Sequence, residues 1–216
     1  MTESFMTIIE GGSGEVLIKK SRFIATVYPV STEEEAIYFI DDLKKKFWDA
    51  SHNCYAYIIG TEKPILRCSD DGEPSKTAGR PMLDVLLHHE LTNLVIVVTR
   101  YFGGTLLGTG GLVKAYQSAA IEGLNNCIII KKILGNKIQI TTDYNMIGKI
   151  QYYLNQDHIT ILSSEYTDIV QLTILVPPTQ QDYCTKKIAE LTNNSATLMM
   201  NGYVYFTNLN SEVILF

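Results

Sequence analysis

The chain has 216 residues, of which 46% are apolar and 19% charged, and its formal net charge is −5. This composition is typical of a globular protein with one large or two modest cores, and it excludes a disordered chain. No apolar run approaches the roughly 18 residues that span a bilayer, and the N-terminus lacks the basic start and apolar core of a signal peptide. We therefore expect a cytoplasmic protein without a membrane partner.

Neither half of the chain is basic. Residues 1–134 carry 14 basic and 16 acidic residues, and residues 135–216 carry 4 basic and 7 acidic residues. A general nucleic-acid-binding protein has an excess of positive charge. Any contact with RNA must therefore come from a local patch, and we expect no specificity for DNA.

Strands and helices alternate in the first 134 residues. Apolar and polar residues alternate over 16–30, which predicts two short strands or a bent hairpin. Ser31 and Glu34 have the spacing of a capping box, and the apolar stripe after them predicts a helix as far as Phe47. The next predicted elements are strands over 54–59 and 65–68, a helix with Pro81 in its first turn, and a strand over 94–98.

The most informative stretch is the glycine-rich segment Thr99–Tyr116. It follows the apolar run Leu94–Val98, which predicts a buried strand, and leads into a helix predicted over Leu112–Leu124. A strand, a glycine loop and a helix in this order can present several backbone N–H groups to one anion. The alternative is that the glycines only permit tight turning and close packing. The candidate anion-binding residues are Arg22, Arg100, Gly103, Gly104, Thr105, Thr109, Gly110, Gly111 and Lys114.

An acidic turn, Ser69–Pro81, precedes this segment. Asp70, Asp71 and Glu73 lie around a glycine and are a candidate oxygen ligand set for Mg²⁺. The competing interpretation, which we favour, is that an aspartate forms an Asx turn or pairs with Arg80 or Arg100. The acidic turn would then anchor the positive side chains that line the glycine loop.

The second half of the chain predicts a separate domain. Gly135–Asn136 is a candidate boundary, which divides the chain into residues 1–134 and 135–216. The pattern after it is strand, helix, strand, strand, helix, strand, the βαββαβ order of a ferredoxin-like domain. Asp143 can cap the first of these helices.

No catalytic motif is present. The sequence contains no HExxH, GxSxG or kinase signature. No two of its four cysteines lie within ten residues of each other, which excludes a CxxC motif, and Cys54 is interpreted as a small buried apolar residue. The sequence therefore gives little support to hydrolysis, and no catalytic residue is assigned.

Four blocks in the first 130 residues resemble the IMPACT family, whose bacterial branch is called YigZ. They are KKSRFIA from Lys19, SHNCYAYIIG from Ser51, DDGEP with TAGRPML from Asp70, and RYFGGTLLGTGGLVKAY from Arg100. The resemblance implies an α+β protein of two domains. The first would be a two-layer α/β sandwich shared with GHMP kinases and a domain of elongation factor G, and the second a ferredoxin-like domain.

The resemblance also implies a link to translation, because eukaryotic members of the family regulate it with the help of an additional N-terminal domain. Our first hypothesis is a non-enzymatic translation-associated regulator that binds RNA, the ribosome or a translation factor through a face formed by Arg22, Arg100 and Lys114. The second hypothesis is an enzyme or sensor for a small phosphorylated ligand, held by the glycine loop with Mg²⁺ on the acidic turn.

Overall fold

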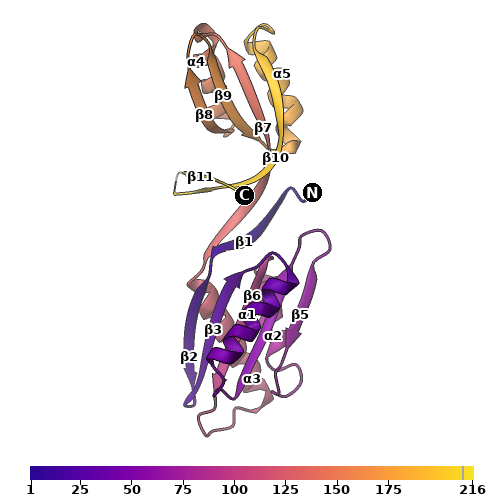
Figure 1. Ribbon diagram of the computed structural model, residues 1–216, viewed down its shortest axis with the longest axis vertical. Helices are drawn as coiled ribbons and strands as arrows, with labels where there is room; N and C mark the ends of the chain where they lie inside the picture. The colour runs from indigo at the N-terminus through magenta and orange to yellow at the C-terminus, as the bar shows by residue number, and fades with distance from the viewer. Residues whose placement is uncertain (211) are drawn as a thin grey trace. The chain divides into compact units, whose positions relative to one another are not determined.

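The computed structural model describes residues 1–210 and 212–216. The chain forms two compact units, which are described separately (Figure 1). The first, called here the N-terminal unit, comprises Phe5–Lys131. The second, the C-terminal unit, comprises Lys132–Phe216 together with Met1–Ser4.

The N-terminal unit is built on an antiparallel sheet with its most apolar strand in the middle. The strand order is β2-β3-β6-β4-β5. The strands are β2 (Gly12–Ile18), β3 (Ser21–Pro29), β4 (His52–Ile59), β5 (Ile65–Ser69) and β6 (Leu94–Tyr101). A further strand, β1 (Ser4–Glu10), was not expected from the sequence and pairs with β7 (Ile128–Thr142).

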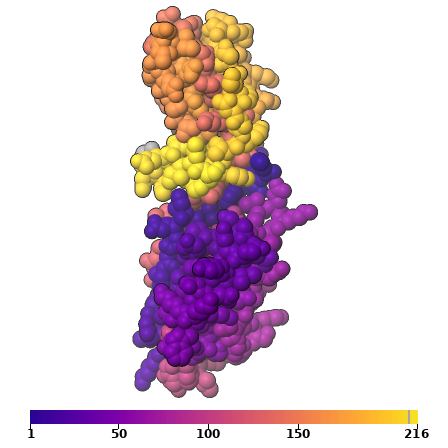
Figure 2. Space-filling model, in the orientation of Figure 1, coloured from indigo at the N-terminus to yellow at the C-terminus, as the bar shows by residue number. Residues whose placement is uncertain are grey.

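Helices cover both faces of this sheet. Helices α2 (Gly79–His88) and α3 (Gly108–Asn125) pack on one face, where Ile96 and Val98 of β6 are buried. Helix α1 (Glu33–Lys46) covers the other face, over Val95 and Val97, and its side chains hide the middle of the sheet in Figure 2. Because β6 is buried on both faces, it has no polar alternation, which explains its unbroken apolar run. The predicted α+β class is confirmed, and in the N-terminal unit α1 adds a third layer to the predicted two.

Helix α1 starts one residue later than the predicted capping box. Its N-cap is Thr32, whose Oγ1 accepts a hydrogen bond from the Glu35 N–H at 3.2 Å. The Glu35 carboxylate in turn accepts from the Ser31 N–H at 2.6 Å. The pairing of Ser31 with Glu34 was wrong because two overlapping pairs in the sequence have the same spacing, and only the helix start decides between them.

The C-terminal unit has the predicted βαββαβ order. Its main sheet follows the order β11-β10-β7-β9-β8, and helices α4 and α5 pack on one face over Ile138, Ile140 and Leu172. The elements after β7 are α4 (Tyr144–Gln156), β8 (Thr160–Tyr166), β9 (Val170–Val176), the short 3₁₀ helix η1 (Pro178–Gln180), α5 (Gln181–Leu191), β10 (Thr197–Leu209) and β11 (Glu212–Leu215). Asp143 caps α4, as predicted, by accepting from the Asn145 and Met146 N–H groups at 2.8 and 3.1 Å.

The predicted domain boundary at Gly135–Asn136 lies inside a strand. Strand β7 runs through both residues, and a Cβ added to Gly135 would lie 2.8 Å from the ring of Phe206. The glycine therefore serves close packing in a strand rather than a turn. By contacts the two units divide between Lys131 and Lys132, inside β7. The division into residues 1–134 and 135–216 stays a prediction.

Across the described parts of the chain, no helix is sufficiently long and apolar to cross a bilayer.

Candidate functional site

Both carboxylate oxygens of Asp70 accept hydrogen bonds from backbone N–H groups of the protein. Its Oδ1 accepts from the N–H groups of Ala78 and Gly79 at 3.0 and 2.8 Å, and its Oδ2 accepts from the Lys76 N–H at 2.8 Å. Ala78 and Gly79 form the first positions of α2. The carboxylate is therefore an internal anion at the positive end of that helix.

Asp71 points to a different element. Its Oδ1 lies 2.8 Å from Lys44 Nζ, and its Oδ2 accepts from the Asn53 N–H at 2.7 Å. Burial on its own would raise the pKa of Asp71, but the Lys44 ammonium and the Asn53 N–H outweigh burial and hold this pKa below its ordinary value. Asp71 therefore joins α1 to the start of β4.

Glu73 makes the ion pair that the sequence predicts for the acidic turn. Its Oε1 lies 2.6 Å from Arg100 Nη1 and accepts from the Tyr116 hydroxyl at 2.7 Å. Both charged side chains are buried, at 3% and 7% exposed. The prediction was wrong in detail, because neither aspartate contacts Arg100 and Arg80 instead pairs with Asp84. The acidic turn nevertheless anchors Arg100.

The donor set does not fit a metal ion. Each of the three acids accepts hydrogen bonds from protein groups. Among residues 1–210 and 212–216, no group of three or more His, Cys, Asp or Glu side chains could hold a metal ion. The carboxylates of this turn stabilise the fold, and the Mg²⁺ hypothesis has no ligand cluster here.

The glycine-rich segment is shorter as a loop than predicted. Helix α3 begins at Gly108, four residues before the expected Leu112, so that Thr109, Gly110 and Gly111 lie in its first turn. No side chain caps this start, and its first turn contains no acidic residue. The N–H groups of Gly108, Thr109 and Gly110 have no partner within the helix, because the first turn of any α-helix leaves them free.

Two of the predicted loop residues have conformational roles. A Cβ on Gly103 would collide with the backbone of Lys20, and the Gly103 N–H donates to Ser21 Oγ at 3.0 Å. Gly104 has φ +81°, a conformation that favours glycine. Thr105 beside it is exposed. Close packing therefore explains Gly103, and tight turning explains Gly104.

The three predicted cations do not form one face. Arg100 lies opposite Phe23 in the sheet and shares its buried side, under α2 and α3. Arg22 lies opposite Tyr101, the next pair along these two strands, so its side chain projects from the other side of the sheet. There it forms an ion pair with Glu15 at 2.8 Å. Lys114 is exposed on α3. The predicted grouping was therefore wrong, because alternation along two paired strands separates Arg22 from Arg100.

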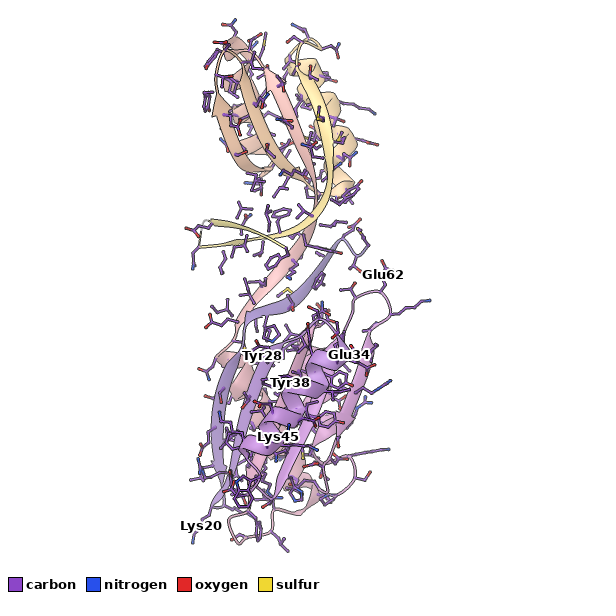
Figure 3. The ribbon with its side chains drawn as sticks, viewed as in Figure 1. Lys20, Tyr28, Glu34, Tyr38, Lys45 and Glu62 are labelled. Atoms are coloured by element: carbon purple, nitrogen blue, oxygen red, sulfur yellow. The ribbon has the colours of Figure 1, made fainter. Side chains whose placement is uncertain are left out.

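Two lysines that were not among the predicted site residues lie beside the segment that leads into α3. The helix packs along β2, with Gly12 against Asn126 and Gly14 against Glu122. The backbone of Lys20 lies against Gly103, in the segment that leads into α3. Lys19 and Lys20 are exposed at the tip of the β2–β3 turn, where Figure 3 labels Lys20. The paired lysines in the first resembling block were the available signal.

A cavity of about 520 Å³ opens beside the same helix start. Its ionisable residues are His52, Glu73 and Arg100, which lie under α2 and α3 on neighbouring strands and the acidic turn. Gly108 and Thr109 bring the helix start to the cavity. The remaining lining is Ser51, Gly72, Pro74, Phe102, Leu106, Leu107 and Leu112. Sequence analysis missed His52 and the apolar lining, since these residues gather only when the sheet is formed.

The cysteine beneath this cavity is not a nucleophile. Burial raises the pKa of the Cys54 thiol, so it stays protonated at neutral pH. Its Sγ lies 2.9 Å from the Asp70 carbonyl oxygen and 3.3 Å from the Tyr116 hydroxyl. The interpretation of Cys54 as a small buried residue is confirmed.

Comparison with known proteins gives one family match within each of the two units. The model of the Impact N-terminal domain matches residues 19–124, and a domain of unknown function (DUF1949) matches residues 140–195. The chain is 40% identical over 205 residues to the IMPACT family member YvyE of Bacillus subtilis, covering 95% of this chain and 94% of that protein. It is 34% identical over 184 residues to the IMPACT family member YigZ of Escherichia coli, covering 84% and 90% of the two chains.

A solved structure has the same architecture. The crystal structure of a hypothetical protein, 32% identical in sequence, aligns with a TM-score of 0.60 over 92% of this chain and 98% of that one. The order of the two domains, the identity along nearly the whole chain and this structural match lead to one conclusion: the chain belongs to the IMPACT family.

Proposed function

We propose that this protein is a non-enzymatic, translation-associated regulator that binds RNA or a ribosome-linked factor through one end of its N-terminal unit. We call this the basic end and define it by Lys19, Lys20, Lys114 and the first-turn N–H groups Gly108–Gly110. Membership of the IMPACT family supports the link to translation. The structure supports the choice of surface.

The observation that carries this proposal is the uncapped start of α3, with an exposed lysine on the same helix and two more on the turn that contacts Gly103. Lys19, Lys20 and Lys114 are exposed, and none of them forms an ion pair within the described chain. Backbone N–H groups at a helix start bind phosphate, and lysines beside them add attraction of longer range. A protein with a net charge of −5 can bind a polyanion only through such a local concentration of positive charge.

The two central strands of the C-terminal unit lack the aromatic side chains of an RNA-binding sheet. Ferredoxin-like RNA-binding domains stack bases on aromatic side chains of the open sheet face. The central strands β7 and β9 present Gln139, Thr141, Gln171 and Thr173 there, because their neighbours Ile140 and Leu172 face the core. We therefore assign the contact to the N-terminal unit.

A second function, sensing of a small phosphorylated ligand, is favoured by the cavity beside the helix start. It would use the N–H groups of Gly108 and Thr109 without Mg²⁺ on the acidic turn. It does not require the lysines, and this separates it from the first function in experiment.

The test is co-sedimentation with ribosomes at low and moderate salt. The triple variant Lys19→Gln/Lys20→Gln/Lys114→Gln removes the side-chain charge of the basic end. Each lost phosphate contact reduces the magnitude of the negative slope of log K against log salt by about 0.9. We therefore expect the salt dependence to weaken by about 3 units of slope and binding at moderate salt to be lost.

The matched control is Lys45→Gln/Lys63→Gln/Lys186→Gln, which makes the same change in net charge at three exposed lysines elsewhere. It is expected to sediment like the wild type. Equal binding by the two triple variants, or no association of the wild type at any salt, would contradict the proposal.

A further inference from the structure

The floor of the cavity has unused hydrogen-bonding groups. Arg100 is only 5% exposed, and its Nη1 contacts Glu73. Its Nε is buried and has no partner among the described residues. The second oxygen of Glu73, Oε2, has His52 Nε2 at 3.9 Å, beyond hydrogen-bond distance. A buried guanidinium and a buried carboxylate thus line the cavity, and each has an atom without a hydrogen-bond partner among the described residues.

His52 adds an oriented nitrogen to this floor. Its Nδ1 lies 2.8 Å from the carbonyl oxygen of Asp71. A carbonyl only accepts, so Nδ1 carries the hydrogen and Nε2 is an acceptor in the neutral ring. Together with Glu73 Oε2, the floor therefore offers two acceptors beside the Arg100 donor. A ligand with N–H groups on one edge matches this arrangement.

The rim offers the opposite kind of group. Gly108 and Thr109 line the cavity and carry free N–H groups at the start of an 18-residue helix. No carboxylate or hydroxyl side chain occupies them. This end of the cavity favours a negatively charged group.

The walls between floor and rim are apolar. Phe102, Leu107 and Leu112 line them, and Phe102 is 49% exposed. The guanidinium carbon of Arg100 lies 5.6 Å from the centre of the Phe102 ring. A flat ring in the cavity would bury this exposed aromatic surface, as bases do on aromatic side chains in single-stranded nucleic-acid sites.

We propose that this cavity binds one nucleotide, with its base against Phe102 and the leucines and its phosphate on the first turn of α3. The amino edge of the base donates to Glu73 and His52. The volume of about 520 Å³ lies in the range of small-ligand sites, roughly 300–1,000 Å³. The nucleotide comes either from solution or from a single strand of RNA. This inference rests on the proposed function, because the same helix start holds the phosphate.

The test is calorimetric titration of the full chain with 5′-AMP, adenosine and a penta-adenylate. Thr109→Glu places a carboxylate at the helix start, where it competes with the phosphate and stabilises the helix. Ser118→Glu adds the same charge at an exposed position further along α3. We expect 1:1 binding of 5′-AMP, at least tenfold weaker binding of adenosine, at least tenfold weaker binding of 5′-AMP by Thr109→Glu, and binding within twofold of wild type by Ser118→Glu.

The two sources of the nucleotide give different results. If the ligand is free, 5′-AMP binds as tightly as the penta-adenylate. If it belongs to RNA, the penta-adenylate binds at least tenfold more tightly and with a steeper salt dependence. Absence of binding of both ligands to the wild type, or equal affinities of Thr109→Glu and Ser118→Glu, would overturn the inference.

Failure of this inference is distinguishable from failure of the proposed function. Phe102→Ser tests the cavity alone, because it removes the aromatic wall of the cavity and leaves the three lysines in place. If the wild type binds ribosomes and the lysine triple variant does not, while no nucleotide binds, the basic end stands and the cavity assignment fails. If 5′-AMP binds and ribosomes do not, the cavity assignment stands and the translation proposal fails.

Discussion

Two helix starts in the N-terminal unit, those of α2 and α3, are built in opposite ways. At α2, the Asp70 carboxylate accepts from three backbone N–H groups and fills the positive end. At α3, no side chain caps the first turn, and Gly108 and Thr109 of this turn line a cavity. The chain therefore supplies its own anion to one helix and leaves the other open to an external one.

This difference explains why the acidic and glycine-rich segments belong together. The acidic turn uses Asp70 to fix α2 and Glu73 to hold Arg100 beneath the cavity. Helix α3 is then free to present its first turn at the surface. Substitutions at the two helix starts should therefore change the stability of the protein to different extents.

Removal of the Glu73 carboxylate has the largest expected effect. Glu73→Ala leaves the buried Arg100 cation without its partner, which costs about 3–5 kcal/mol of the free energy of unfolding. The double variant Glu73→Leu/Arg100→Met, which removes both charges, should recover much of this loss. The measurement is urea denaturation, and a loss below about 1 kcal/mol for Glu73→Ala would show that the pair is not structurally important.

Opening the closed helix start comes next. Asp70→Ala leaves three N–H groups without their charged acceptor, and we expect a loss of about 2 kcal/mol. The matched control on the same helix is Asp84→Ala, which removes only an exposed pair with Arg80 and should cost about 0.5 kcal/mol or less. Equal losses in the two variants would mean that Asp70 does not act as a cap.

Closing the open helix start has a smaller effect of the opposite sign. Thr109→Glu supplies α3 with an internal anion, so it should raise the free energy of unfolding by about 0.5 kcal/mol at low salt. The gain should fade as salt is added. A destabilised Thr109→Glu variant would indicate that the first turn of α3 has another internal partner.

The acid dependence of stability gives the smallest expected effect. The pKa of Asp71 lies below its ordinary value of 3.8, so its contribution is present above that value and is lost as pH falls through the lowered pKa. Asp71→Asn should therefore be less stable than wild type near pH 7 and lose less stability on acidification. Parallel stability curves for the two proteins between pH 5 and pH 2 would contradict this role.

The sequence predicted the elements better than the site. The apolar run of β6, the βαββαβ order and the Asp143 cap follow from local patterns, and each is confirmed. The start of α3 at Gly108 was missed because glycines at positions 108, 110 and 111 are poor helix formers, and tertiary packing overrides their preference.

The composition of the site depends on contacts between distant segments. Arg22 and Arg100 belong to opposite sheet faces only once the pairing of β3 with β6 is known. The turn that contains Lys19 and Lys20 lies beside the glycine-rich segment only once the chain is folded, through the contact of Lys20 with Gly103. Single-sequence reasoning selected the exposed Lys114, but it did not select Lys19 or Lys20 and it placed Arg22 and Arg100 on one face.

The most direct test of the open helix start is a backbone ¹H–¹⁵N spectrum of the full chain titrated with the penta-adenylate. We predict that the amide signals of Gly108, Thr109 and Gly110 shift with saturable dependence on concentration, while those of Ala78 and Gly79, already bonded to Asp70, stay in place. Unchanged signals at the start of α3 throughout the titration, or shifts confined to the C-terminal unit, would contradict the account.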